Sequence, residues 1–243
     1  MKKNSWLLGI PLLAAVLVLS SFAMQEHERI KGNGDVKQEK RNATAFRDIG
    51  TSGEFKVYIQ QGNTHAISVE AESNLLPYIE TEIDGHELEI KVKKGYQLKP
   101  TRPINVYVTM EQVNELAASG SGGFYSKGRL KTSSLELSVS GSADADLDVD
   151  AQSMKVAVSG ASNVKLKGSA AQAHYSVSGK ADIAAFDLQS DDVRIGISGS
   201  ANANVNAQKK LEVGVSGMGN VKYKGNPSIS QSVSGMGRIS KEG

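Results

Sequence analysis

The chain of 243 residues contains no cysteine, one tryptophan and five prolines. Without cysteine, disulfide bonds and lipid attachment at a processed cysteine are both excluded. Aromatic residues make up 5% of the chain, so few ring faces are available to stack on a ligand. The four histidines show no spacing typical of a zinc site. The composition therefore offers little material for redox, metal or aromatic-platform chemistry.

The first 23 residues have the features of a secretory signal. Lys2 and Lys3 precede an apolar stretch at 7–19, and Ser21-Phe22-Ala23 is a small-x-small cleavage site. The apolar stretch is shorter than the roughly 20 residues that span a bilayer. We expect export to the periplasm, the cell surface or the medium, with no membrane span after signal removal. Removal lowers the formal charge from +2 to 0, which does not favour binding to nucleic acid.

A Ser-Gly dipeptide recurs seven times after residue 118, at intervals of 18 to 21 residues. Its glycines are Gly120, Gly141, Gly160, Gly179, Gly199, Gly217 and Gly235. Such a period is typical of chains that stack small units, none of which can bury its apolar side chains alone. We call each segment between successive dipeptides a coil, and we expect the glycines to form its bends.

Apolar residues occupy alternate positions on both sides of each glycine, which predicts strands with one buried face. Because these positions match from copy to copy, we predict an all-β fold, a right-handed parallel β-helix or solenoid of 18–21-residue coils. Antiparallel hairpins are the alternative. The parallel register would place Asp146 beside Lys165 and Asp148 beside Lys167.

Four segments follow from these patterns: the signal at 1–23, a flexible polar linker at 24–44, a β-rich region at 45–118 and the repeats at 119–243. The β-rich region lacks the regular repeat. It would act as a cap on the first coil or form early, less regular coils.

Several ordered motifs carry a resemblance to a known family. They are Phe46-x-x-Ile49, the run from Lys56 to Gly62, Val69-Glu70-Ala71, Asn74-Leu75-Leu76 and the Val-Ser-Gly copies. Over about residues 45–243 the chain resembles the secreted bacterial family called putative auto-transporter adhesin, head GIN domain. The resemblance implies an all-β, β-helix-like fold in the cell envelope, and it supplies no catalytic residues.

A polysaccharide-active enzyme is the less favoured interpretation of the repeats. The column three residues after each glycine contains Asp144 and Asp182, which would lie ~9.5 Å apart, near the upper limit for an inverting glycosidase pair. A regular Asp/Asn ladder that bonds nearby groups explains the column better. The repeated serines have no histidine base repeated beside them. We therefore expect no enzyme activity, no catalytic or metal-binding residue and no cofactor.

The remaining hypotheses concern binding. We predict a non-catalytic envelope protein that presents its β surface for adhesion or for binding a protein or glycan partner. Tyr58, Tyr107 and Tyr125 are the candidate surface residues, although packing across neighbouring strands is the alternative role for each. The second hypothesis is a self-associating structural protein, a homo-oligomer that pairs through residues 228–240.

Overall fold

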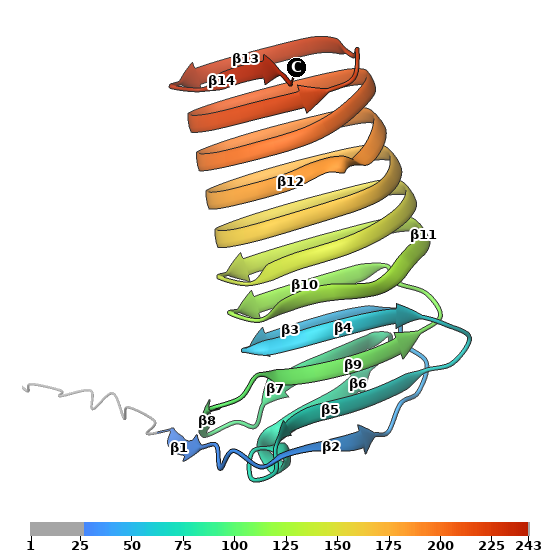
Figure 1. The fold of residues 1–243 in the computed structure, drawn as a ribbon, viewed down its shortest axis with the longest axis vertical. Coiled ribbons are helices and arrows are strands. Elements are labelled where there is room, and N and C mark those ends of the chain that lie inside the picture. The colour runs from blue at the N-terminus through green and yellow to red at the C-terminus, as the bar shows by residue number, and fades with distance from the viewer. Residues whose placement is uncertain (1–26, 243) are drawn as a thin grey trace, which may run out of the picture.

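The computed structural model describes residues 27–242, and the predicted signal at 1–23 lies outside them. The described part is all-β, as predicted, with a single short 3-10 helix, η1 (Leu76–Tyr78). Its long strands wind in layers stacked along one axis (Figure 1).

The strands fall into two groups along the chain. The first group comprises β1 (Glu28–Lys31), β2 (Val36–Arg41), β3 (Asp48–Gly53), β4 (Phe55–Gln61), β5 (Ala66–Glu72), β6 (Ile79–Asp84), β7 (Glu87–Val92), β8 (Tyr96–Lys99) and β9 (Ile104–Met110). The second group comprises β10 (Glu115–Gly120), β11 (Gly123–Gly141), β12 (Asp144–Lys224), β13 (Ser228–Gly235) and β14 (Arg238–Lys241). Apart from β1 and β8, which form a separate pair, all of them belong to one mixed sheet.

The repeated dipeptides stack directly on one another in parallel register. Gly120 of β10 is the partner of Gly141 of β11, which in turn pairs with Gly160 of β12. At the far end, Gly217 of β12 pairs with Gly235 of β13. Parallel pairing of the repeats is thereby confirmed, and antiparallel hairpins are wrong for these pairs.

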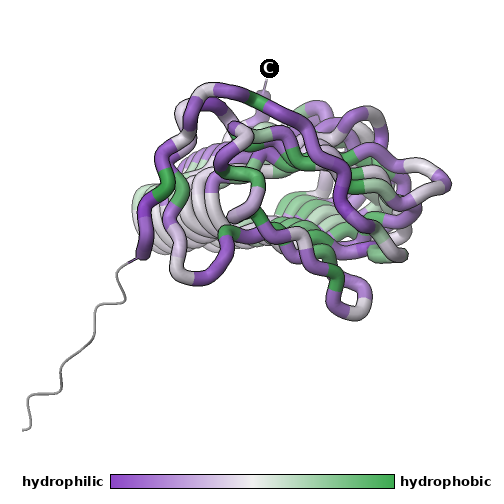
Figure 2. The backbone as a smooth tube through the Cα atoms, turned by 90° about the horizontal axis from the view of Figure 1, so that it is seen from below, coloured by the Kyte–Doolittle hydropathy of each residue, from purple (hydrophilic) through white to green (hydrophobic). Residues whose placement is uncertain are grey.

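The alternation of apolar and polar residues sorts the side chains as the pattern indicates. Inward positions two residues before the glycines are buried from Val139, 2% exposed, to Val215, 3% exposed. The outward neighbours at Ser140 and Ser216 are exposed. A single continuous apolar core runs through the stacked coils. Seen along the coil axis, mainly hydrophilic segments of the N-terminal strands lie in front of those coils (Figure 2).

The bends demand glycine for two reasons. All seven repeat glycines have positive φ, for example +120° at Gly179, which side chains rarely tolerate. A Cβ added at Gly179 would also lie 2.6 Å from the carbonyl oxygen of Gly160 in the layer below. The polar segment 150–153 does not interrupt the strand, because Asp150, Ala151 and Ser153 pair with β11 and β12 continues through this corner.

A further copy of the dipeptide lies upstream of the regular repeat. Ser52-Gly53 of β3 pairs in register with Ser119-Gly120 of β10, although 67 residues separate them. Between them the chain leaves the stack, forms β5 to β9 and returns. Within this excursion β7 pairs in parallel with β3, and β9 pairs in parallel with β4. Region 45–118 thus contains strands in the same parallel stack as the repeats.

Antiparallel strands close the N-terminal end of the stack. β5 pairs with β9 and carries β2 on its outer edge, while β6 covers the edge of β7. The prediction of a flexible linker at 24–44 is therefore wrong for residues 28–31 and 36–41, which form β1 and β2. Their sequences are strongly polar, and their order comes from pairing with β8 and β5.

A buried carboxylate fastens the N-terminal segment to the body. Glu72, at the end of β5, is fully buried and accepts hydrogen bonds from the backbone N–H groups of Gly34, Thr101 and Arg102 and from Thr101 Oγ1. Burial alone would raise the pKa of Glu72, but these hydrogen bonds outweigh it and lower the pKa to about 2. A Cβ at Gly32 would overlap this carboxylate.

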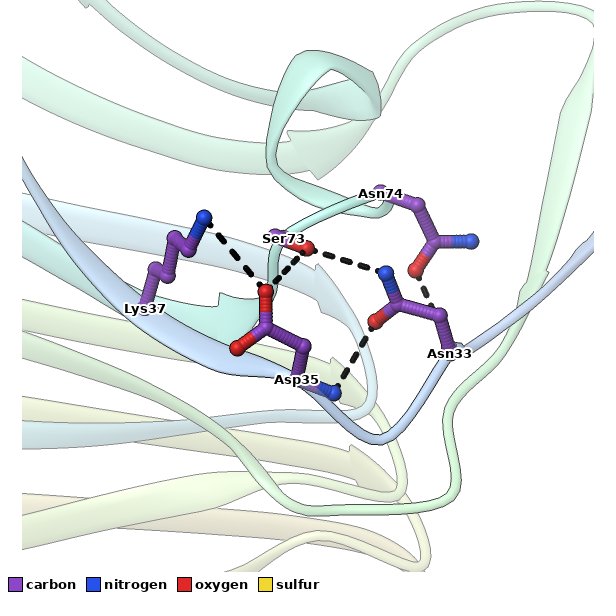
Figure 3. A network of polar contacts seen from close by, with 5 residues as sticks. All are labelled: Asn33, Asp35, Lys37, Ser73 and Asn74. Atoms are coloured by element: carbon purple, nitrogen blue, oxygen red, sulfur yellow. Dashed lines mark hydrogen bonds and ion pairs between the residues drawn. The ribbon is translucent and has the colours of Figure 1, made fainter.

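A surface network reinforces the same attachment (Figure 3). Asn33 Nδ2 donates to Ser73 Oγ over 2.9 Å, and the backbone N–H of Asn33 donates to Asn74 Oδ1 over 3.1 Å. Ser73 Oγ donates to Asp35, which also pairs with Lys37. The loop between β1 and β2 is thus fixed to the segment that follows β5.

The two predicted charge pairs have different outcomes. Lys165 Nζ lies 3.9 Å from Asp146 Oδ2, so the first pair is confirmed. Asp148 instead pairs with Arg129 of the preceding coil, whose Nε lies 2.8 Å from Asp148 Oδ1. Arg129 follows a register irregularity in β11 that brings it opposite Asp148, and this irregularity has no repeat-based signal.

Candidate binding surfaces

The three candidate tyrosines form one row across β9, β4 and β11. Tyr58 stacks on Tyr107 with ring centroids 5.4 Å apart, and on Tyr125 at the same separation. Lys127 Nζ lies 4.4 Å from the centroid of the Tyr107 ring. Register explains the row, since each tyrosine is the direct cross-strand partner of the next.

The tyrosine row can do little as a stacking platform. Both faces of Tyr58 are covered by its neighbours, and sugar recognition by aromatics needs a free face. Burial, followed by the charge of Glu70, raises the pKa of Tyr107, whose hydroxyl donates to Glu70 Oε1 over 3.3 Å. The contacts therefore match the packing role that was the alternative for these residues.

The serine column lines a long recess, which we call the serine groove. Its volume is about 950 Å³, and it crosses the strands from β3 to β13. Its first row consists of the repeated serines, all exposed: Ser52, Ser119, Ser140, Ser159, Ser178, Ser198, Ser216 and Ser234. Its second row, two residues earlier in each strand, contains only glycine, alanine and serine: Gly50, Ala117, Ser138, Ala157, Ser176, Gly196, Gly214 and Ser232.

The groove owes its form to these small side chains. Outward residues on a strand normally project several atoms, whereas here two adjacent rows project two atoms at most. The result is a long, smooth surface with a line of hydroxyls that can donate or accept hydrogen bonds. The repeat of the serines is visible in the sequence, but the groove is not, because the residues of the second row share size rather than residue type.

A charged row borders the groove. Lys155, His174 and Arg194 line an adjoining recess of about 540 Å³. Lys155 Nζ lies 3.9 Å from Glu136 Oε2, and Arg194 Nε lies 2.6 Å from Glu212 Oε2.

Toward the N-terminal end, this border is acidic. Burial, together with the charges of Glu136, Asp48 and Glu87, raises the pKa of Glu115. The border therefore changes from acidic carboxylates on β7, β3 and β10 to a mixture with bases farther along the stack.

The Asp/Asn column forms the ladder that its regularity indicates. Asp144 Oδ1 accepts from both the backbone N–H and Nδ2 of Asn163, at 3.0 and 3.1 Å. Asn202 Nδ2 donates to Asp182 Oδ1 over 2.7 Å, and Asn220 donates to Asn202. The two carboxylates that an inverting mechanism would require are thus engaged in bonds between coils.

Within residues 27–242 no cluster of three or more His, Asp or Glu side chains is placed to hold a metal ion. In the same part of the chain, no helix has the length and apolar character needed to cross a membrane.

Comparison with family models gives one match over most of the chain. The model described as "Putative auto-transporter adhesin, head GIN domain" matches residues 45–227. No curated protein matches the chain.

Solved structures of three bacterial proteins share the fold. A protein described as a putative adhesin from Bacteroides fragilis is 22% identical with a TM-score of 0.83, over 88% of this chain and 100% of its own. One described as a putative lipid binding protein from Parabacteroides distasonis is 26% identical with a TM-score of 0.70, over 89% and 100%. A putative adhesin from Parabacteroides merdae is 23% identical with a TM-score of 0.66, over 89% and 100%.

Proposed function

Because the chain belongs to the family described as "Putative auto-transporter adhesin, head GIN domain", we propose that it is a non-catalytic, exported protein that binds an extended ligand along the serine groove. The proposal includes a right-handed parallel β-helix for the stacked coils. The parallel registers support it, as does the strong preference of parallel crossover connections for the right hand.

The single observation that carries the binding proposal is the shape and chemistry of the serine groove. A chain of sugars or an extended peptide presents polar groups at regular intervals, and hydroxyls repeat here at every strand, ~4.8 Å apart. Eight exposed serines could therefore contact successive ligand units at once. Many weak contacts in a row provide avidity without a deep pocket.

A glycan is the ligand class we favour. The hydroxyl row can both donate and accept, which matches the hydroxyls of a sugar chain. The charged border with Lys155 and Arg194 adds contacts for carboxylated or sulfated sugars. The tyrosine row is the second candidate surface, because its ring edges and Lys127 remain available even though the face of Tyr58 is covered.

The test is a glycan array probed with the exported chain, followed by titration of each bound glycan. Ser159→Tyr and Ser178→Tyr place rings in the groove and should abolish binding. Ala184→Tyr is the matched control, because Ala184 is an exposed small residue outside the groove lining. Tyr125→Ala tests the tyrosine row.

Binding that survives both groove variants but disappears in Tyr125→Ala would move the site to the tyrosine row. An array without any bound glycan would refute the glycan proposal. In that case a fatty-acid probe is the next measurement, because the similar protein from Parabacteroides distasonis is described as a putative lipid binding protein.

A further inference from the structure

The outermost strand of the stack has an uncovered apolar layer. Among residues 27–242, β13 pairs with β12 on one edge and with no strand on the other. Its inward side chains Ile229 and Val233 are 44% and 42% exposed, whereas their equivalents one coil earlier, Leu211 and Val215, are 0% and 3% exposed. Met236, just after β13, is 77% exposed. Another strand laid on this edge would bury the same column that each inner coil buries.

The sequence of β13 is a chemical palindrome. From Ser228 to Ser234 it reads Ser-Ile-Ser-Gln-Ser-Val-Ser, which is symmetric about Gln231 except that isoleucine faces valine. In an antiparallel pair of such strands about a two-fold axis at Gln231, Ile229 lies opposite Val233 of the second copy. Self-complementarity of this kind is what an interface with two-fold symmetry requires.

Charge supports the same partner. The position held by Ser230 in β13 carries a titratable side chain in the five preceding coils: Glu136, Lys155, His174, Arg194 and Glu212. Charged side chains on an exposed edge discourage pairing with another strand, and β13 has none between Ser228 and Gly235.

The other end of the stack is a poor partner for β13. Its edge strands are β2 and β6. β2 reads Val-Lys-Gln-Glu-Lys-Arg, with four of six residues charged, and β6 reads Ile-Glu-Thr-Glu-Ile-Asp, with three of six charged. Stacking of β13 on either strand of another copy would place these charges against an uncharged strand. Strand β13 of a second copy is therefore the better partner for β13.

We propose that β13 is a dimerisation strand, which pairs antiparallel with β13 of a second copy about an axis at Gln231. Ile229 and Val233 of each copy then cover each other, and the two Gln231 amides meet on the axis. Directly opposed residues of an antiparallel pair project on the same side, so Ser230 lies beside Ser232 of the second copy. Ser234 lies opposite Ser228 of the second copy, so the serine grooves of the two copies lie on the same side of the joined sheet but are displaced from each other along the strands.

Single cysteines test the register, because the chain has none of its own. Gln231→Cys should form a disulfide-linked dimer under mild oxidation, since opposed residues have Cα atoms ~4.5–5.5 Å apart. Ser230→Cys alone should remain uncrosslinked, because its symmetry mate is displaced along the strand beyond the ~7 Å limit. A mixture of Ser230→Cys and Ser232→Cys chains should crosslink.

Charged side chains placed on both strands of the interface test it without oxidation. The double variant Ser230→Lys, Ser232→Lys should sediment as a monomer at concentrations where the wild type is a dimer, with unchanged circular dichroism. The corresponding double glutamate variant should also be monomeric, and mixing the two should restore a dimer. The same lysine pair at Ser138 and Ser140, on an inner coil, is the control and should leave the dimer intact.

Three results would overturn the proposal. They are a wild type that remains monomeric at high micromolar concentration, a dimer unaffected by the lysine pair in β13, and crosslinking of Ser230→Cys with itself in place of Gln231→Cys. The glycan measurements on the groove do not depend on this interface, so failure of one proposal leaves the other intact.

Discussion

Replacement of Glu72 by glutamine removes the charge that fastens the N-terminal segment to the stack. One carboxylate oxygen becomes an NH2 group that faces hydrogen-bond donors. These are either the backbone N–H groups of Thr101 and Arg102, or the backbone N–H of Gly34 and the hydroxyl of Thr101. Each buried donor left without an acceptor costs about 1–3 kcal/mol. Because two such donors lose their acceptor, we expect Glu72→Gln to lower the free energy of unfolding by about 2–6 kcal/mol.

The pH dependence follows from the direction of the shift. The pKa of Glu72 in the folded chain, about 2, lies below the ordinary value of 4.5. Its contribution to stability is therefore complete above pH 4.5 and is lost as the pH falls from 4.5 toward 2. Glu72→Gln should lack this part of the acid dependence.

Urea unfolding at pH 7 and pH 3, followed by circular dichroism, measures both effects. Glu39→Gln is the matched control, since Glu39 lies exposed on the outer strand β2 and should change stability by less than about 0.5 kcal/mol. Equal stability of Glu72→Gln and Glu39→Gln at pH 7 would refute the stabilising role of the Glu72 carboxylate. An unchanged acid dependence in Glu72→Gln would refute the assignment of the low pKa.

Three further outcomes are expected. Thermal melting should show that Val177→Asp and Gly179→Val each lower the free energy of unfolding by several kcal/mol or prevent folding, whereas Ser178→Ala should be nearly neutral. Val177→Asp buries an unpaired charge, and Gly179→Val forces a Cβ against the layer below. The intact mass of the exported protein should correspond to a chain that begins at Met24, whereas the mass of the full-length chain would show that the signal is retained. No polysaccharide should be cleaved, and a turnover that disappears in Asp182→Asn would contradict the structural role of the ladder.

The sequence was sufficient for the parallel stack because one feature repeats without exception. Each of the seven regularly spaced Ser-Gly copies has an inward apolar residue just before it, and only a parallel register superimposes these columns. The copy at Ser52-Gly53 was not predicted to belong to the stack, because the excursion through β5 to β9 breaks the spacing of about 20 residues. The dipeptide itself was the signal that could have found it.

The polar strands β1 and β2 could not be predicted from local pattern. Their residues do not alternate between apolar and polar, and their order depends on partners far along the chain, above all Glu72. The tyrosine row was identified as three outward residues, but whether the rings stack on each other depends on the register between β9, β4 and β11. That register is fixed by the excursion, which no short-range pattern encodes.

The stacked glycines have a consequence for how such a molecule can change its length. Each coil meets its neighbours through the same bend and the same inward column, so a duplicated segment of about 19 residues would fit between two existing coils without altering either end. Each duplication would lengthen the molecule by one strand spacing, ~4.8 Å. Duplication and deletion of coding sequence can thus adjust the length of the proposed binding surface in fixed steps, independently of the strands that close the N-terminal end.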